Sequence, residues 1–126
     1  NGVGGHIERN EDILSGALRE MKEETGLDVI NTRFCGTLHV DVGNHNGIMV
    51  WVFRAEAPTR DVVASDEGTL EWIPRSRVDS LPLVEDLPAI IPLIFDRPAD
   101  APPFFIHTSY DANDDIVLRI VTPAKA

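Results

Sequence analysis

The spacing of apolar residues near the start of the chain follows a helical period. Apolar side chains recur three and four positions apart, which predicts an amphipathic helix that packs by this stripe. Asn10 is the expected cap of this helix, followed by first-turn acids, and Gly26 marks its end. The stripe consists of Leu14, Ala17, Leu18 and Met21.

After this helix the pattern changes to short runs typical of strands, separated by polar turns. The first two runs are joined by a polar turn at residues 43–46, and the last two form a hairpin over about residues 103–122. The third run ends at Pro74. The predicted strands are residues 29–42, 47–57, 69–73, 104–110 and 115–121.

Residues 85–95 predict a second helix. Pro88 fits its first turn, whereas Pro92 should interrupt or kink it. Strands and helices in this order predict an α/β or α+β sandwich. The length of 126 residues suits a single domain, residues 1–126.

The formal net charge of −10 argues against binding to a nucleic-acid polymer or to an anionic membrane surface, because both attract basic proteins. Cys35 is the single cysteine, so there is no internal disulfide, and it is expected to be a small buried residue. Its isolation suits a reducing, cytoplasmic location. His39, His45 and His107 lack a shared metal spacing and are expected to be structural or surface residues.

Three glutamates share one face of the first helix. With about 100° of turn per residue, Glu20, Glu23 and Glu24 fall within a roughly 100° arc. Such an acidic run is often a solvated surface. Like charges at this spacing destabilise a helix, however, and carboxylate oxygens in one small volume suit Mg²⁺ or Mn²⁺, which also bind phosphates. The sequence therefore predicts a metal site that handles a polyphosphate.

These glutamates belong to a longer pattern at residues 5–27: a glycine, five residues, a glutamate, seven residues, then Arg-Glu-apolar-x-Glu-Glu-x-Gly-apolar. This pattern resembles the signature of the Nudix family. Residues 1–5, 65–72 and 81–86 resemble the MutT-type branch, in particular the 8-oxo-dGTP diphosphatases. The fixed positions of the pattern are Gly5, Glu11, Arg19, Glu20, Glu23, Glu24 and Gly26.

The resemblance implies an α/β/α sandwich around a mixed β-sheet and hydrolysis of a nucleoside diphosphate linked to another group. It also implies that Arg19 orients the glutamates. Glu67 would complete the metal site or activate water, although a turn carboxylate is the alternative. Glu23 and Glu67 both remain candidates for the general base. The implied metal ligands are Glu20, Glu23, Glu24, the Gly4 carbonyl and Glu67.

The resemblance further implies a set of substrate-binding residues. Asn1 and the Glu85–Asp86 pair match positions that contact an oxidised purine, while Gly5 lies in a loop that lets the backbone approach phosphate. A plain loop residue and an acidic helix cap are the alternatives for these positions. His6 stands where many relatives have lysine, and a solvated loop histidine is expected there.

Nudix domains place a strand or two ahead of the glycine loop, which here begins at Asn1. We therefore expect the N-terminal strands to be missing from the sequence or supplied by something else, and the sequence by itself to fold poorly.

The leading hypothesis is a metal-dependent pyrophosphohydrolase that converts a nucleoside triphosphate, such as 8-oxo-dGTP, to the monophosphate and pyrophosphate. One alternative is the same chemistry on a nucleotide sugar, a dinucleoside polyphosphate or an undamaged nucleotide. Another is a non-catalytic sensor or interaction module. The expected partner is a small nucleotide, and the expected assembly is a monomer or homodimer.

Overall fold

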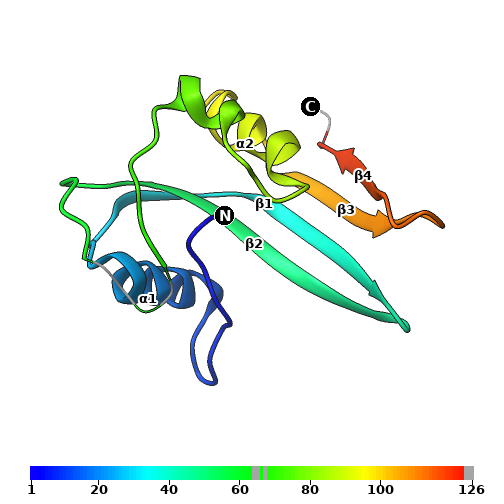
Figure 1. Cartoon of the computed structure of the whole chain (residues 1–126). Helices are drawn as coiled ribbons and strands as arrows, with labels where there is room; N and C mark the ends of the chain where they lie inside the picture. Colours follow the sequence, from blue (N-terminus) through cyan, green and yellow to red (C-terminus); the bar gives the residue numbers. More distant parts are fainter. Residues whose placement is uncertain (64–65, 67, 124–126) are drawn as a thin grey trace. The chain divides into compact units, whose positions relative to one another are not determined.

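The computed structural model describes all residues except 64, 65, 67 and 124–126 (Figure 1). The chain divides into two compact units. The first comprises Asn1–Thr32 and Ala55–Pro82, and the second comprises Arg33–Arg54 and Leu83–Ala126. The single domain expected from the sequence stays a prediction.

The first unit holds helix α1, Ile13–Thr25. Its N-cap is Asp12, whose carboxylate accepts from the backbone N–H of Ser15 at 2.8 Å, so the expected cap at Asn10 is wrong by two residues. Asn10 instead has a positive φ of 64°, which places it in the turn ahead of the helix. Gly26 ends the helix with φ 77°, as predicted, and its N–H donates to the Lys22 carbonyl.

The apolar stripe of α1 is partly buried: Ala17 and Met21 are half-buried, whereas its two leucines are exposed. Leu14 is 44% exposed and Leu18 is 37% exposed, whereas the buried helix residues are Gly16, Glu24 and Thr25. Polar contacts from Arg19 also hold the helix to the loop ahead of it. The periodic pattern found the helix correctly, and the structure bears out its buried face only in part.

The remainder of the first unit is largely irregular. A 3₁₀ helix, η1, spans Arg75–Ser80, which the sequence pattern did not predict. The strand expected at residues 69–73 is wrong, since these residues form no strand. Trp72 is anchored through its side chain instead: its indole N–H donates to the Arg60 carbonyl at 2.9 Å, and the Arg60 guanidinium lies over its ring.

A four-stranded sheet forms most of the second unit, with strand order β2-β1-β3-β4. Central strands β1 and β3 are parallel, and β3 pairs with β4 antiparallel, so the sheet is mixed. Together with the helices it gives the α+β class expected from the sequence. The strands are β1, Ile30–Gly43; β2, Asn46–Glu56; β3, Phe104–Tyr110; and β4, Ile116–Val121.

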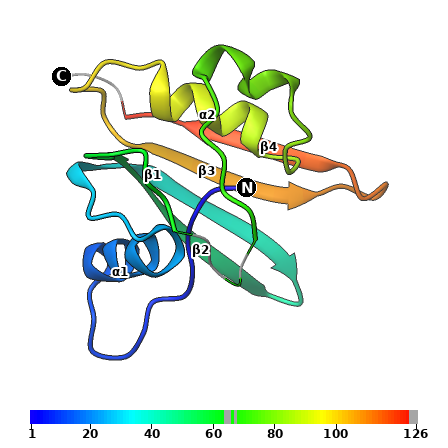
Figure 2. The same cartoon turned by 60° about the vertical axis from the view of Figure 1, so that its left-hand side comes forward.

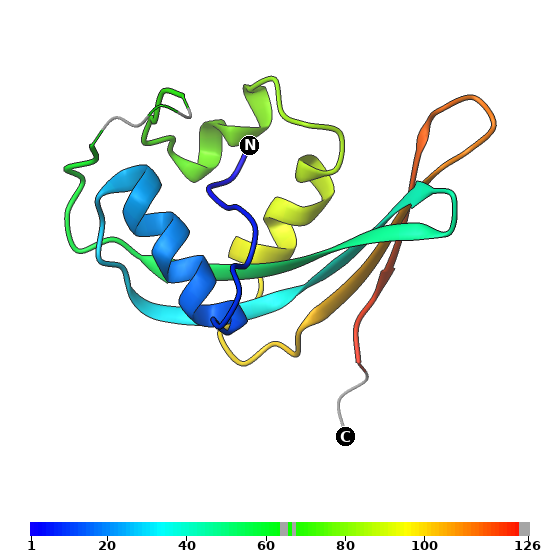
Figure 3. The same cartoon turned by 90° about the horizontal axis from the view of Figure 1, so that it is seen from below.

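Two hairpins build this sheet, and their turns lie at the same end of it (Figure 3). Asn44 and His45 connect β1 to β2 and have φ values of 55° and 61°, the geometry of a type I′ turn that matches the twist of the strands. Both hairpins occur within a residue or two of their predicted bounds. Residues 1–12 form no strand.

Helix α2, Leu87–Phe95, covers one face of the sheet (Figure 2). Its buried Ile90 packs with Phe104 and Ile106 of β3 in the core of the unit. Pro88 lies in the first turn as predicted, but Pro92 does not interrupt the helix. In so short a helix Pro92 removes one internal hydrogen bond, the one to the Pro88 carbonyl, and the helix continues.

Cys35 is a buried core residue of β1, as expected, and burial raises the pKa of its thiol. The strand register brings His39 and His107 side by side, with ring centroids 5.2 Å apart, which the sequence did not reveal. In the part of the chain that the structure describes, no helix is both long and apolar enough for a membrane span.

Candidate metal and nucleotide site

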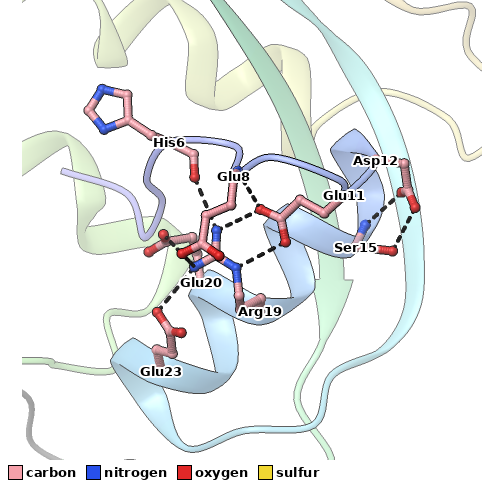
Figure 4. A network of polar contacts seen from close by, with 8 residues as sticks. All are labelled: His6, Glu8, Glu11, Asp12, Ser15, Arg19, Glu20 and Glu23. Atoms are coloured by element: carbon pink, nitrogen blue, oxygen red, sulfur yellow. Dashed lines mark hydrogen bonds and ion pairs between the residues drawn. The ribbon is translucent and has the colours of Figure 1, made fainter.

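Arg19 is the centre of a network of carboxylates on α1 and the preceding loop (Figure 4). Its Nη1 donates to Glu20 Oε1 at 2.9 Å and to Glu23 Oε2 at 3.2 Å. The other edge of the Arg19 guanidinium donates two hydrogen bonds to Glu11, from Nη2 to Oε1 at 2.8 Å and from Nε to Oε2 at 3.1 Å. The bidentate pair with Glu11 fixes the guanidinium plane, and that plane holds Glu20 and Glu23 toward one point.

The loop ahead of α1 is bound to the same guanidinium. The His6 carbonyl accepts from Arg19 Nη2 at 3.1 Å, and Glu8 lies 3.6 Å from Arg19 Nη1. The imidazole of His6 points away from the network, in agreement with an exposed loop histidine (Figure 4). Arg19 therefore ties the loop to the helix, and its side chain is only 22% exposed.

These contacts favour the ionised forms of Glu11 and Arg19. The Arg19 hydrogen bonds lower the pKa of Glu11, with the backbone N–H of Glu8 as the next contribution. The same hydrogen bonds, to Glu11 and then to Glu20, raise the pKa of Arg19. At the helix start, hydrogen bonds from Ser15 lower the pKa of Asp12. The Arg19–Glu11 pair is thus fully ionised at neutral pH.

The glycine loop lies directly against the glutamates. The Gly4 N–H donates to Glu24 Oε2 at 3.1 Å, and Glu24 is only 8% exposed. At Gly5 a Cβ would overlap the Glu20 carboxylate, so only glycine allows this approach. We call Gly4, Gly5, Arg19, Glu20, Glu23 and Glu24 the carboxylate corner.

The donors in the carboxylate corner suit a hard divalent cation. Glu20 and Glu23 converge on a single cationic nitrogen of Arg19, and Glu24 is adjacent to Gly4, whose carbonyl is the fourth expected ligand. Carboxylate and carbonyl oxygens are the ligands that Mg²⁺ and Mn²⁺ prefer. The described residues contain no group of three side chains already in position around one ion. Metal binding would therefore require the carboxylates to turn from Arg19 toward the ion.

Glu67 and Asn1 are two further residues that the sequence predicted for the site. Glu67, the expected downstream acid, lies outside the described residues. Asn1 is an exposed residue of the first unit, where its side-chain oxygen accepts from the N–H of Gly2 at 2.8 Å.

Glu85 and Asp86 belong to the second unit and lie in the turn before α2. Asp86 occupies the N-cap position, but its carboxylate makes no cap hydrogen bond, so the acidic-cap interpretation does not account for it. Both acids line a pocket of about 370 Å³ on the second unit. We call it the α2-turn pocket; its lining residues are Val40, Leu83, Val84, Glu85, Asp86, Thr108, Tyr110 and Ile116.

Sequence reasoning missed three contributors to these regions. Glu11 was a fixed position of the motif but was expected only as a first-turn acid; it lies just ahead of α1, where it pairs with Arg19. No sequence pattern indicated that Glu8 would lie near Arg19. Thr108 joins the pocket only because strand register places it opposite Val40.

The family model that matches this chain is the NUDIX domain, over residues 1–94. The chain belongs to the Nudix family. Among solved structures, a mutator MutT protein from Bacillus halodurans is similar, with a TM-score of 0.76 and 28% sequence identity over 94% of this chain and 79% of that one. That likeness confirms the fold class and the MutT-like resemblance.

Curated relatives match over a shorter span. An uncharacterized Nudix hydrolase, YvcI, from Bacillus subtilis is 33% identical over 85 residues, which is 64% of this chain and 54% of the relative. An oxidized purine nucleoside triphosphate hydrolase from Danio rerio is 31% identical over 83 residues, 65% of this chain and 51% of the relative. The chain therefore spans about half the length of these curated relatives.

Proposed function

We propose that this chain carries out metal-dependent hydrolysis of a nucleoside triphosphate, in particular an oxidised purine nucleotide such as 8-oxo-dGTP, giving the monophosphate and pyrophosphate. The observation that supports it most directly is the carboxylate corner. Arg19 gathers Glu20 and Glu23 on one side while Glu11 fixes its plane on the other. A solvated acidic surface would need no such anchoring.

Glu20, Glu23, Glu24 and the Gly4 carbonyl would hold Mg²⁺ or Mn²⁺, which neutralises negative charge on the phosphate oxygens. Water attacks a phosphorus, pyrophosphate leaves, and a carboxylate accepts the proton of the water. Of the two candidates for that base, Glu23 is the one that the structure describes. Its side chain is 60% exposed, whereas Glu20 is 15% exposed, so Glu23 is the more accessible to water. Glu67 remains the alternative base.

Two observations support the proposed preference for an oxidised purine nucleotide. Relatives from Danio rerio and Mus musculus are named as oxidized purine nucleoside triphosphate hydrolases. In the second unit, the α2-turn pocket combines apolar walls with two carboxylates, Glu85 and Asp86, as expected for a planar group that carries N–H donors. An 8-oxo purine has an N–H at N7 that the undamaged base lacks, so an ionised acceptor such as Asp86 would favour it.

The test is release of pyrophosphate from 8-oxo-dGTP and dGTP, and of AMP from ADP-ribose, with and without Mg²⁺. We expect magnesium-dependent release from the triphosphates and a higher kcat/KM for 8-oxo-dGTP. Turnover of ADP-ribose in place of the triphosphates would support the alternative of a different nucleoside-diphosphate substrate. A lack of turnover in every case, with ligand binding retained, would support the non-catalytic sensor.

A further inference from the structure

Thr108 is a buried residue that lines the α2-turn pocket. The residue lies on β3, is 1% exposed, and is opposite Val40 of β1 and Leu118 of β4. It follows Phe104 and Ile106, the two core residues of β3, on the same face of the sheet. Thr108 is therefore a position where an apolar residue would continue the core.

The Thr108 hydroxyl has no hydrogen-bond partner among the residues that the structure describes. Buried polar side chains normally have one, and leaving one without a partner destabilises the folded protein. A valine would fill nearly the same volume without that penalty. The hydroxyl therefore has no evident role in stability, and it belongs to a residue that lines a pocket.

The two carboxylates of the pocket have the opposite hydrogen-bonding character to the Thr108 hydroxyl, and the phenol of Tyr110 can both donate and accept. Glu85 and Asp86 can only accept when ionised, whereas the Thr108 hydroxyl can donate. Val40, Leu83 and Ile116 supply apolar walls. A planar heterocycle with both an N–H and a ring carbonyl would satisfy these groups together, and the pocket volume of about 370 Å³ is in the range of small-molecule sites.

We infer that Thr108 is a ligand-binding residue of the α2-turn pocket, where its hydroxyl donates to a carbonyl oxygen of a bound oxopurine. This inference rests on the proposed nucleotide function and adds a residue to it. Because guanine and 8-oxoguanine share the 6-carbonyl, the Thr108 contact should contribute to the affinity of both. It should not set the preference between them, which is the proposed role of Asp86.

The experiment compares Thr108→Val, which removes the hydroxyl, with Thr108→Ser, which keeps it. Thr37→Val is the matched control, because Thr37 is also buried in the sheet but does not line the pocket. Binding of dGMP and 8-oxo-dGMP is measured by calorimetry, so the readout does not require turnover. Thermal unfolding without ligand is measured for each variant.

We expect Thr108→Val to weaken binding of both monophosphates about fivefold, with their ratio unchanged, since a neutral hydrogen bond contributes about that much. Its Tm without ligand should equal that of the wild type or exceed it by up to ~3 °C. Thr108→Ser and Thr37→Val should bind both ligands within about twofold of the wild type.

Unchanged binding by Thr108→Val overturns the inference, as does a fall in its Tm of more than ~3 °C, which would mean that the hydroxyl has a structural partner. Lack of binding of either monophosphate to the wild type also overturns it. Magnesium-dependent pyrophosphate release, measured on the same samples, then shows whether the proposed function fails as well.

Discussion

The carboxylate corner and the α2-turn pocket are built in opposite ways. The corner takes its side chains from one loop and one helix within residues 4–24, and they are held by a cation, Arg19. The pocket takes its lining from residues 40 to 116, on three strands and the turn before α2. Its walls are mostly apolar, the Asp86 carboxylate makes no cap hydrogen bond, and the Thr108 hydroxyl has no hydrogen-bond partner among the described residues.

This difference shows how each region responds to change. In the corner, the side chains contact one another, so altering one residue disturbs several charges at once. In the pocket, Thr108 and Asp86 belong to separate elements, and each can be altered with little effect on the other. The rate of hydrolysis should therefore fall sharply when a residue of the carboxylate corner is substituted. The preference between nucleotides should change less when a residue of the α2-turn pocket is substituted.

The largest expected effect is in the corner. Glu23→Gln keeps the shape of the side chain but removes the charge, so kcat for pyrophosphate release should fall about 10²–10⁴-fold if Glu23 is the base. Glu8→Gln is the matched control, because Glu8 is 66% exposed and only 3.6 Å from Arg19, and it should retain most activity. Wild-type turnover by Glu23→Gln would transfer the role of base to another carboxylate, with Glu67 the first to test.

The next largest effect on activity is expected in the glycine loop ahead of α1. Gly5→Ala adds a methyl group where the Glu20 carboxylate lies, so it should displace that ligand and lower kcat/KM by about 10²-fold. Gly2→Ala is the control, since nothing lies within 4 Å of the added Cβ. Titration of activity against Mg²⁺ should show that Gly5→Ala alone needs a higher Mg²⁺ concentration for half-maximal activity. Equal behaviour of the two variants would mean that the loop does not position Glu20.

A smaller effect is expected in the pocket. Asp86→Ala removes an acceptor that takes no part in capping α2, so the preference for 8-oxo-dGTP over dGTP should fall about tenfold while magnesium dependence persists. Asp79→Ala, in an exposed part of η1, should leave the preference intact. The measurement is the ratio of the two kcat/KM values. If that ratio survives in Asp86→Ala, Asp86 has no part in base selection.

The smallest effect is on stability. Because Arg19 lowers the pKa of Glu11 below its usual 4.5 in the folded state, the pair stabilises the fold above that pH, and this contribution is lost as the pH falls through the lowered value. Glu11→Gln should therefore lower Tm at pH 7, and the difference from the wild type should shrink below pH 4.5. Thermal melts across pH 3 to 7 test this, with Glu8→Gln as the control. A difference that does not vary with pH would show that charge is not the cause.

The sequence by itself determined the family and the first helix, because residues 5–27 specify a local structure in which neighbours in the chain are neighbours in space. It also located both hairpins, whose alternating residues and turn chemistry are local signals. Leu14 and Leu18 belong to a regular apolar stripe, yet both side chains are exposed, and the Arg19 network holds α1 to the loop ahead of it.

Only the tertiary structure decided the rest. The parallel pairing of β1 with β3 places Thr108 opposite Val40, and no local pattern encodes which strands lie side by side. The same holds for the α2-turn pocket, since the turn before α2 and strands β1, β3 and β4 supply its lining. Strand register and packing bring such residues together, so a pocket of this kind becomes visible only in the folded chain, whereas a contiguous motif can be read directly from the sequence.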